Sequence, residues 1–427
     1  MSEPERDARP NMRTGGVSRR PPVADERYRR SSTEVGKHFK QPSQSNDATP
    51  GAVQAAGSKT LPKTASNSAT QEEPLRRVKK RRRHPALRMV GIGCGSLLGL
   101  ALVFVAIFAV WFGALNSSMS IDDEQERQDL QDALVEPVAR DESFYVLILG
   151  RDARPGDDAS RSDVTMLARI DPATGTVTLV SIPRDTMVTI NGSTQKINAA
   201  NAFAGAAGAV RCVSQFAGVD ISHYVSIDFE GLVEVVDMLG GIWVDIPESF
   251  SAGGYRFQEG EQLLTGEQAL VFVRDRHHVS GGDFGRAQAQ RLVVEAILRQ
   301  VLKSSPVELP GVITKLAGCI TTDLSVVQLI EYGQQFLGKS LTVYSAVCPS
   351  YTLWQDGVSY VGTMFDEWRR MMQLTDAGLD PNSDTAEIPE AQLENEELGA
   401  APNSPAPRDY EERAQNAMTT DDVKSAA

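Results

Sequence analysis

The sequence predicts an α/β domain, with a mixed sheet covered by helices, that follows one membrane-spanning segment. Three observations lead to this class. Between residues 143 and 375, short apolar runs that fit buried strands alternate with segments of helical periodicity. The turn sequence Asp171-Pro172-Ala173-Thr174-Gly175 joins two of the strands as a hairpin, so part of the sheet is antiparallel. One long uncharged apolar stretch precedes this region.

The first 88 residues are predicted to be a disordered basic tail. Residues 1–83 contain 19 Lys and Arg against 9 Asp and Glu, a net charge of +10, and few large apolar side chains. Such a composition buries too little surface to offset the entropy of the chain. The tail ends in the basic cluster of residues 76–83.

Residues 89–115 are predicted to be a transmembrane signal-anchor helix. These 27 residues carry no charge and, as a helix, are ~40 Å long, enough to cross a bilayer with some tilt. A cleaved signal peptide is the alternative, but its apolar region is normally shorter and closer to the N-terminus. The basic cluster before the span indicates a cytoplasmic N-terminus and an extracellular domain in the cell membrane.

The polar residues 116–142 are interpreted as a stalk, and the folded domain is expected over residues 143–375. The expected strands cover residues 144–149, 164–170, 177–182, 223–229, 242–246, 269–273, 343–347 and 358–361. The expected helices cover residues 198–216, 230–239, 285–302, 324–337 and 365–374. Residues 376–427 hold 3 Lys and Arg against 13 Asp and Glu, a net charge of −10, and are predicted to be a disordered acidic tail.

The charge balance and the cysteines limit the function classes. The net charges of the two tails, +10 and −10, cancel, so the part between them carries the whole chain's net charge of −13. A net negative charge argues against nucleic acid as a partner of this part. Cys212, Cys319 and Cys348 follow the span and allow at most one disulfide. Small buried thiols are the default, and one bridge stays open for an extracellular domain.

Two carboxylates stand at the ends of neighbouring predicted strands. Asp152 follows the strand 144–149, and Asp163 opens the strand 164–170. Carboxylate oxygens are the ligands that Mg²⁺ prefers, and one or two of them with substrate phosphates suffice. The alternative for each aspartate is capping or loop hydrogen bonding.

Arginines recur at the same strand ends. Arg161 lies two residues from Asp163, and Arg274 lies two residues from Arg276, after the expected strand 269–273. Residues two apart in an extended segment face the same side, so Arg161 is expected beside Asp163. The two arginines Arg274 and Arg276 on one face are expected to hold an anion between them. Taken singly, each arginine could instead be solvated surface or part of a structural ion pair.

Further polar positions lie in the motif Ser181-Ile182-Pro183-Arg184-Asp185 and in two later segments of the chain. They are Arg184 itself, Lys196 before the helix 198–216, and Asp283, Arg286 and Gln290 at the start of the long helix. Arg286 and Gln290 are four residues apart and share one helix face, while Asp283 could serve as an N-cap. The adjacent His277 and His278 are interpreted as part of a loop rather than as ligands of one metal ion.

These motifs, in this order, resemble the LytR-CpsA-Psr family of bacterial envelope phosphotransferases over roughly residues 143–305. The resemblance implies a three-layer α/β/α fold and Mg²⁺ as cofactor, held by Asp152 and Asp163. It implies catalytic roles for these two and for Arg161, Arg274 and Arg276. It also implies pyrophosphate binding by Arg184, Lys196, Asp283, Arg286 and Gln290. Family members are often more basic where this sequence has Ala287, Gln288 and Ala289.

The resemblance further implies a reaction. A polyprenyl-pyrophosphate-linked glycan would be transferred to a peptidoglycan hydroxyl, expected to be the 6-hydroxyl of N-acetylmuramic acid, with release of polyprenyl phosphate. A hydrolase of the same pyrophosphate and a non-catalytic binder or regulator of polyprenyl lipids are the alternatives. The glycopolymer, the lipid chain length, the oligomeric state and the general base are left open by the sequence.

Overall fold

The computed structural model describes residues 102–107, 109–139, 141–151, 162–276, 278, 283–412 and 417–419. The basic tail, the first part of the expected span, Asp152, Arg161 and His277 lie outside these residues.

A six-stranded mixed sheet forms the centre of the domain, with the strand order β11-β6-β1-β2-β3-β12. The strands are β1 (Phe144–Arg151), β2 (Ser162–Asp171), β3 (Thr176–Ser181), β6 (Ile221–Asp228), β11 (Thr321–Thr322) and β12 (Thr342–Val347). β2 pairs antiparallel with β1 and β3, and β11 pairs antiparallel with β6, whereas β6 runs parallel to β1 and β12 runs parallel to β3. The expected hairpin at Asp171–Gly175 therefore joins β2 to β3 and makes the sheet mixed.

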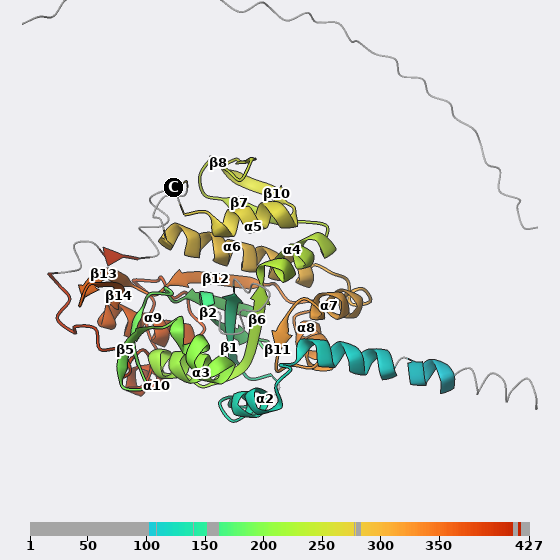
Figure 1. Ribbon diagram of the computed structural model, residues 1–427, viewed down its shortest axis with the longest axis horizontal. Coiled ribbons are helices and arrows are strands. Elements are labelled where there is room, and N and C mark those ends of the chain that lie inside the picture. Colours follow the sequence, from blue (N-terminus) through green and yellow to red (C-terminus); the bar gives the residue numbers. More distant parts are fainter. Residues whose placement is uncertain are drawn as a thin grey trace, which may run out of the picture. The chain divides into compact units, whose positions relative to one another are not determined.

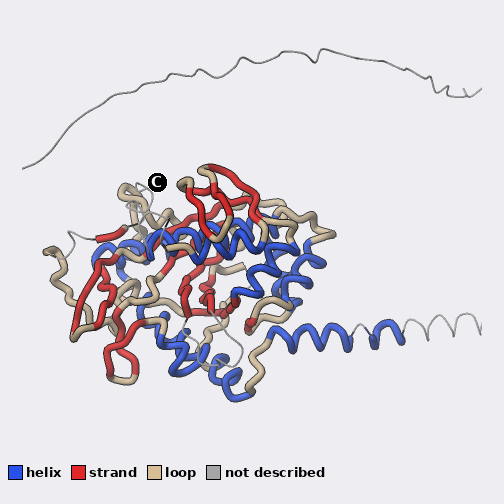
Figure 2. The backbone as a smooth tube through the Cα atoms, turned by 45° about the horizontal axis from the view of Figure 1, so that its top comes forward, coloured by secondary structure: helices blue, strands red, loops and turns tan. Residues whose placement is uncertain are grey.

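Helices cover both faces of this sheet, as Figures 1 and 2 show. The helices of the described domain are α2 (Glu124–Gln131), α3 (Ala199–Ala217), α4 (Phe229–Met238), α5 (Gly266–Arg274), α6 (Asp283–Leu302), α7 (Leu309–Ala317), α8 (Val326–Gln335), α9 (Phe365–Asp376) and α10 (Glu390–Glu394), of which α5 packs on α4 and α6 rather than on the sheet. Alternate residues of β1 divide between two cores: Leu147 packs with α3 and α9, and Val146 packs with α6 and α8. This alternation is the period of a strand, and it confirms the α/β fold with helices on both faces.

Short strand pairs surround the sheet. They are β4 (Met187–Ile190) with β5 (Ser193–Lys196), β7 (Ile242–Ile246) with β10 (Gly260–Leu264), β8 (Phe250–Ala252) with β9 (Tyr255–Phe257), and β13 (Ser350–Gln355) between β14 (Val358–Thr363) and β15 (Ala417–Met418). The β4–β5 hairpin follows the Ser181–Asp185 motif directly, so its position bears on the candidate site.

The expected strand over residues 269–273 is wrong, because these residues belong to α5. Thr265 and Gln268 form a reciprocal capping box that starts the helix. Ala269, Phe272 and Val273 are buried at helical spacing in a core with α4 and α6. The run of apolar residues is thus one buried helix face, which a short window does not distinguish from a buried strand.

The expected acidic tail is ordered and packed from residue 376 to residue 412, so the prediction of disorder is wrong there. Leu398, Ala401, Ala406 and Tyr410 are at most 6% exposed and belong to the core beside α3 and α9. The stalk region also contributes to that core, because Leu130 of α2 is 2% exposed. A few apolar side chains at irregular spacing suffice to fold these segments against the domain.

The described part of the expected span is helical. The helix Leu102–Met119 is apolar enough and long enough to cross a membrane. At its end, Met119 is buried against Ala317 of α7 and Val326 of α8, and the Asn116 side chain accepts a hydrogen bond from the Val326 backbone amide. The three cysteines after this helix are free thiols, so the bridge that the sequence left open is not formed.

Candidate functional site

The Ser181–Asp185 motif meets β2 and α6 at a small cavity of about 40 Å³. Its lining includes Asp163 from the start of β2, Ser181 from the end of β3, and Arg184 and Asp185 from the loop that follows. Arg286 and Gln290 of α6 close the other side. The structure thus brings together four of the ten site residues that the sequence predicts, from segments more than 100 residues apart.

Backbone hydrogen bonds hold the loop after β3 from two directions. The amides of Ile197 and Asn198 donate to the carbonyls of Thr186 and Arg184, and the amide of Val361 in β14 donates to the carbonyl of Asp185 at 2.9 Å. The loop is therefore tied to the ends of β5 and β14 rather than free in solvent. This arrangement fixes the backbone from which Arg184 and Asp185 project.

Opposite charges alternate along this loop. The Arg184 guanidinium lies 2.6 Å from the Asp163 carboxylate, and the Lys196 ammonium lies 2.9 Å from the Asp185 carboxylate. All four side chains are between 25% and 29% exposed. Ion pairs this exposed contribute about 0–1 kcal/mol each to folding, so stability alone gives little reason for them. Arg184 lines the cavity and can exchange its carboxylate partner for an incoming anion, whereas Lys196 reaches the cavity only through Asp185, which lines it.

The α6 side chains are more deeply placed. Arg286 and Gln290 are 9% and 8% exposed, and the Gln290 amide donates to the Val273 carbonyl at 3.5 Å. Their spacing of four residues puts both on the cavity face of α6, as predicted. The helix begins at Asp283. The expected role of the Asp283 side chain in the pocket stays a prediction.

The Ser181 hydroxyl and Thr165 were not recognised from the sequence. Both line the cavity, and the Ser181 oxygen is buried without a hydrogen-bond partner among the described residues. An unsatisfied buried hydroxyl costs free energy unless a ligand bonds to it. The position of Ser181 in the motif could have pointed to it. Val361 also lines the cavity, but it belongs to β14, and no motif in the sequence marks it.

Arg274 and Arg276 do not form the expected pair on a strand end, because Arg274 is the last residue of α5. Its guanidinium stacks 3.8 Å from the ring centroid of Phe229, and Arg276 is exposed beyond the helix end. Neither is among the residues that line the small cavity. Asp275 between them is 9% exposed and accepts two hydrogen bonds from His278, which gives it a structural role.

The metal prediction concerns two aspartates, of which the structure describes only Asp163. No group of three or more His, Cys, Asp or Glu side chains that could hold a metal ion occurs among the described residues. Mg²⁺ needs fewer protein ligands when a bound phosphate supplies oxygens. A partly exposed carboxylate at an anion cavity, such as Asp163, fits that donor set.

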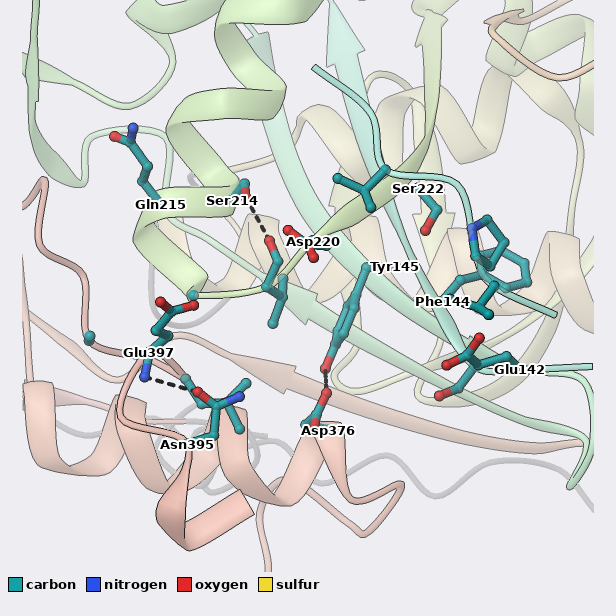
Figure 3. Close-up of a pocket in the computed structure, with 18 of the residues that line it drawn as sticks. Glu142, Phe144, Tyr145, Ser214, Gln215, Asp220, Ser222, Asp376, Asn395 and Glu397 are labelled. Atoms are coloured by element: carbon teal, nitrogen blue, oxygen red, sulfur yellow. Dashed lines mark hydrogen bonds between the residues drawn. The ribbon is translucent and has the colours of Figure 1, made fainter. Parts of the chain in front are cut away.

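A second, larger cavity of about 780 Å³ lies at the opposite end of β1 (Figure 3). Tyr145 donates a hydrogen bond of 3.0 Å to Asp376 there, and burial, with the Asp376 charge, raises the pKa of the tyrosine well above its ordinary value. Its lining includes six carboxylates, from Glu136, Glu142, Asp220, Asp376, Glu396 and Glu397. This lining repels a polyanion, so the smaller cavity is the better anion site despite its size.

The chain is similar to characterised proteins over most of its folded part. The family model described as LytR_cpsA_psr family matches residues 109–375. A protein of Halalkalibacterium halodurans named polyisoprenyl-teichoic acid–peptidoglycan teichoic acid transferase TagU is 33% identical over 264 residues, which are 59% of this chain and 86% of that protein. A protein of the same name from Enterococcus faecalis is 35% identical over 286 residues, 65% of this chain and 93% of that one. A crystal structure from Enterococcus faecalis, described as a transcriptional regulator, has a TM-score of 0.52 and 26% identity, covering 66% of this chain and all of that chain.

Proposed function

The chain belongs to the LytR-CpsA-Psr family, and from this premise we propose that it transfers a glycopolymer from a polyprenyl pyrophosphate to a peptidoglycan hydroxyl. The observation that carries the proposal is the convergence of Arg184, Arg286 and the partnerless Ser181 hydroxyl on one small cavity. The relatives named as teichoic acid transferases support the choice of substrate class.

The donor is recognised through its pyrophosphate. Two linked phosphates concentrate negative charge, and guanidinium groups bind such oxygens through charge-assisted hydrogen bonds. Arg184 would exchange its bond to Asp163 for a phosphate oxygen, and Lys196, held by Asp185, adds positive charge nearby. Arg286 and the Gln290 amide approach the same space from α6.

The reaction exchanges one phosphoester partner for another. The acceptor hydroxyl attacks the glycan-linked phosphorus, the bond to the bridging oxygen breaks, and the electron pair leaves with polyprenyl phosphate. A phosphodiester between glycan and peptidoglycan forms, and the hydroxyl proton passes to a base. Negative charge grows on the leaving phosphate, so fixed cations such as Arg184 and Arg286 stabilise the transition state more than the ground state.

Mg²⁺ is the proposed cofactor, held by Asp163 and by Asp152. When bound, Mg²⁺ would neutralise part of the charge on the pyrophosphate. Arg161, Arg274 and Arg276 are proposed to contact the same substrate, although the two described ones lie outside the small cavity. Asp283 is proposed to line the pocket beside Arg286.

The helix Leu102–Met119, the candidate membrane span, supports a proposal for the placement of the protein. We propose a single-pass protein with a cytoplasmic basic tail and an extracellular domain, where peptidoglycan is accessible. A protease added to cells whose wall has been removed should digest the domain and spare the basic tail. Protection of the domain in intact protoplasts would contradict this orientation.

The test of function uses purified full-length protein, a polyprenyl-pyrophosphate-linked glycan and peptidoglycan, with covalent conjugate as the readout. Arg184→Ala and Arg286→Ala should each lower conjugate formation by roughly 10- to 100-fold, the loss of one or two charge-assisted hydrogen bonds. Arg299→Ala is the matched control, because Arg299 lies on the same helix but pairs with Glu295. Unchanged conjugate formation in the Arg184 and Arg286 variants would place the site elsewhere.

A further inference from the structure

Residues 398–410, here called the C-terminal strap, lie beyond the family match, which ends at residue 375. Resting on the proposed function, we propose that the strap is a positioning element of the anion site. Ser404 of the strap holds the β4–β5 hairpin in the place where Lys196 can pair with Asp185. The hairpin begins one residue after the loop that carries Arg184 and Asp185.

The strap is anchored on α3. Its Gly399 amide donates to the Ala217 carbonyl at 2.8 Å, and the Asn403 side chain donates to the Cys212 carbonyl at 2.9 Å. Gly218, which ends α3 with a φ of +69°, meets the backbone of Glu397 where a Cβ would otherwise be. The strap therefore has a fixed position on the domain before it reaches the hairpin.

From this anchor the strap makes two hydrogen bonds to β4. The Ser404 hydroxyl donates to the Met187 carbonyl at 2.8 Å, and the Asn403 carbonyl accepts from the Thr189 amide at 2.7 Å. Ser404 is 7% exposed, so this contact is shielded from water. Met187 is the residue directly opposite Lys196 in the hairpin. Ser404 thus bonds to the backbone of the residue opposite Lys196, and so helps to fix the position of the Lys196 backbone.

The hairpin needs such support. β4 and β5 form a sheet of only two strands, and a two-stranded hairpin is at best marginally stable by itself. The free edge of β4 is the edge that the strap covers. Since the Lys196 ammonium must reach Asp185 at 2.9 Å, a looser hairpin would let this pair separate. Asp185 lines the cavity, so the loss of its Lys196 partner would change the charge at the proposed anion site.

Two neighbouring strap residues separate positioning from general stability. Ser404→Ala removes the hydroxyl that bonds to β4, whereas Asn403→Ala removes the amide that bonds to α3 and keeps the backbone bond to Thr189. Each variant loses a side-chain hydrogen bond of the same segment, which is buried for Ser404 and part-buried for Asn403. Asn403→Ala is therefore the matched control for the stability of the strap.

The experiment is a double-mutant cycle on the transfer reaction, with hydrogen exchange of the hairpin amides as a second readout. Ser404→Ala should lower transfer by roughly three- to tenfold, as the loss of one hydrogen bond predicts. In a Lys196→Ala background the same change should alter transfer less than about twofold, since coupled residues are not additive. Exchange at the Thr189 amide should rise in Ser404→Ala more than in Asn403→Ala, and Ser404→Thr should restore both readouts.

Three results would overturn the inference. One is an effect of Ser404→Ala that is equal with and without Lys196. Another is hairpin exchange that is the same in the Ser404 and Asn403 variants. If Lys196→Ala leaves transfer unchanged, the role of Lys196 in the proposed function fails, and the inference fails with it. If Lys196→Ala lowers transfer as expected but the effects of Lys196→Ala and Ser404→Ala on transfer are additive, the strap inference fails and the proposed function stands.

Discussion

At the scale of single residues, the ion pair between Asp163 and Arg184 links structure to chemistry. Its two side chains are 29% and 25% exposed, so the pair contributes little to folding. Its value lies in holding a guanidinium at the cavity until a phosphate arrives. The Asp163 carboxylate is also one of the two proposed Mg²⁺ ligands. Its charge is therefore expected to be more important for transfer than the shape of the side chain.

Asp163→Asn keeps the shape of the side chain and removes its charge. Transfer should fall by on the order of 100-fold, because the variant loses a carboxylate ligand and leaves Arg184 without its anionic partner. The melting temperature should change by no more than a few degrees. Transfer rates as a function of Mg²⁺ concentration, alongside melting curves, give the check. A large drop in melting temperature with Mg²⁺ dependence retained would assign Asp163 a structural role.

The thiols give a residue-scale test of burial. Burial raises the pKa of Cys319 to about 12, with a further contribution from Glu234, whose carboxylate accepts a hydrogen bond from the thiol. The reactive thiolate is therefore scarce at pH 8, and alkylation should be slow and accelerate by about tenfold per pH unit. Glu234→Gln should speed it. In a Cys94→Ser background, fast reaction of any thiol at pH 8 in the native protein would contradict this.

The motif residues were predictable because strand ends deliver them. Asp163 and Arg184 lie at strand ends that the sequence pattern shows, and Arg286 and Gln290 share a helix face, although their pocket role came from the family resemblance. All four line the cavity. The positions of Arg274 and Arg276 were not predictable in this way, because they depend on whether residues 269–273 form a strand or a helix. The tertiary contacts of Ala269, Phe272 and Val273 decide that question, and a sequence window does not contain them.

At the scale of elements, Arg274 and Arg276 differ because α5 ends between them. Arg274 lies over the Phe229 ring and in the last turn of the helix, both favourable for a cation. Arg274→Ala should therefore cost about 0.5–1 kcal/mol of stability, whereas Arg276→Ala should cost nothing measurable. Both should lower transfer if they contact the substrate. Chemical denaturation and transfer assays of the two variants separate these effects, and normal transfer in both would remove the arginines from the site.

The ordered C-terminal part is the element that sequence composition concealed. Its acidic, Pro-rich composition is typical of disorder, yet Leu398, Ala401, Ala406 and Tyr410 are buried. Their spacing follows neither a helix nor a strand, so periodicity gives no signal. The groups that they contact lie in α3 and α9, far away in the sequence.

A truncation series tests this order. Ending the chain after Asp376 exposes the surface that those four side chains bury, which costs on the order of 5 kcal/mol, a large part of a domain's usual stability. That variant should fail to fold or melt far below the full chain. Ending it after Glu412 removes β15 with its two-residue pairing to β13 and keeps the four buried side chains, so it should change little. Equal melting temperatures for the two truncations would contradict the packed assignment.

At the scale of the whole molecule, the fold separates three tasks. The helix Leu102–Met119 would hold the protein in the membrane, where a polyprenyl donor resides. The central sheet brings Asp163 and the motif loop to one edge, and α6 covers them. The cavity at the opposite end of β1 is lined by carboxylates, which disfavour the binding of a polyanion at that end.

The most direct test of the proposed transfer is to run the reaction in H₂¹⁸O with the lipid-linked donor and peptidoglycan present. Transfer to a hydroxyl predicts a glycan–peptidoglycan phosphodiester and polyprenyl phosphate that both lack ¹⁸O, with little product from Arg184→Ala. Mass spectrometry of the products reads this out. A glycan phosphate that carries one ¹⁸O as the main product, with the acceptor in excess, would show that water attacks the phosphorus and that the protein is a hydrolase.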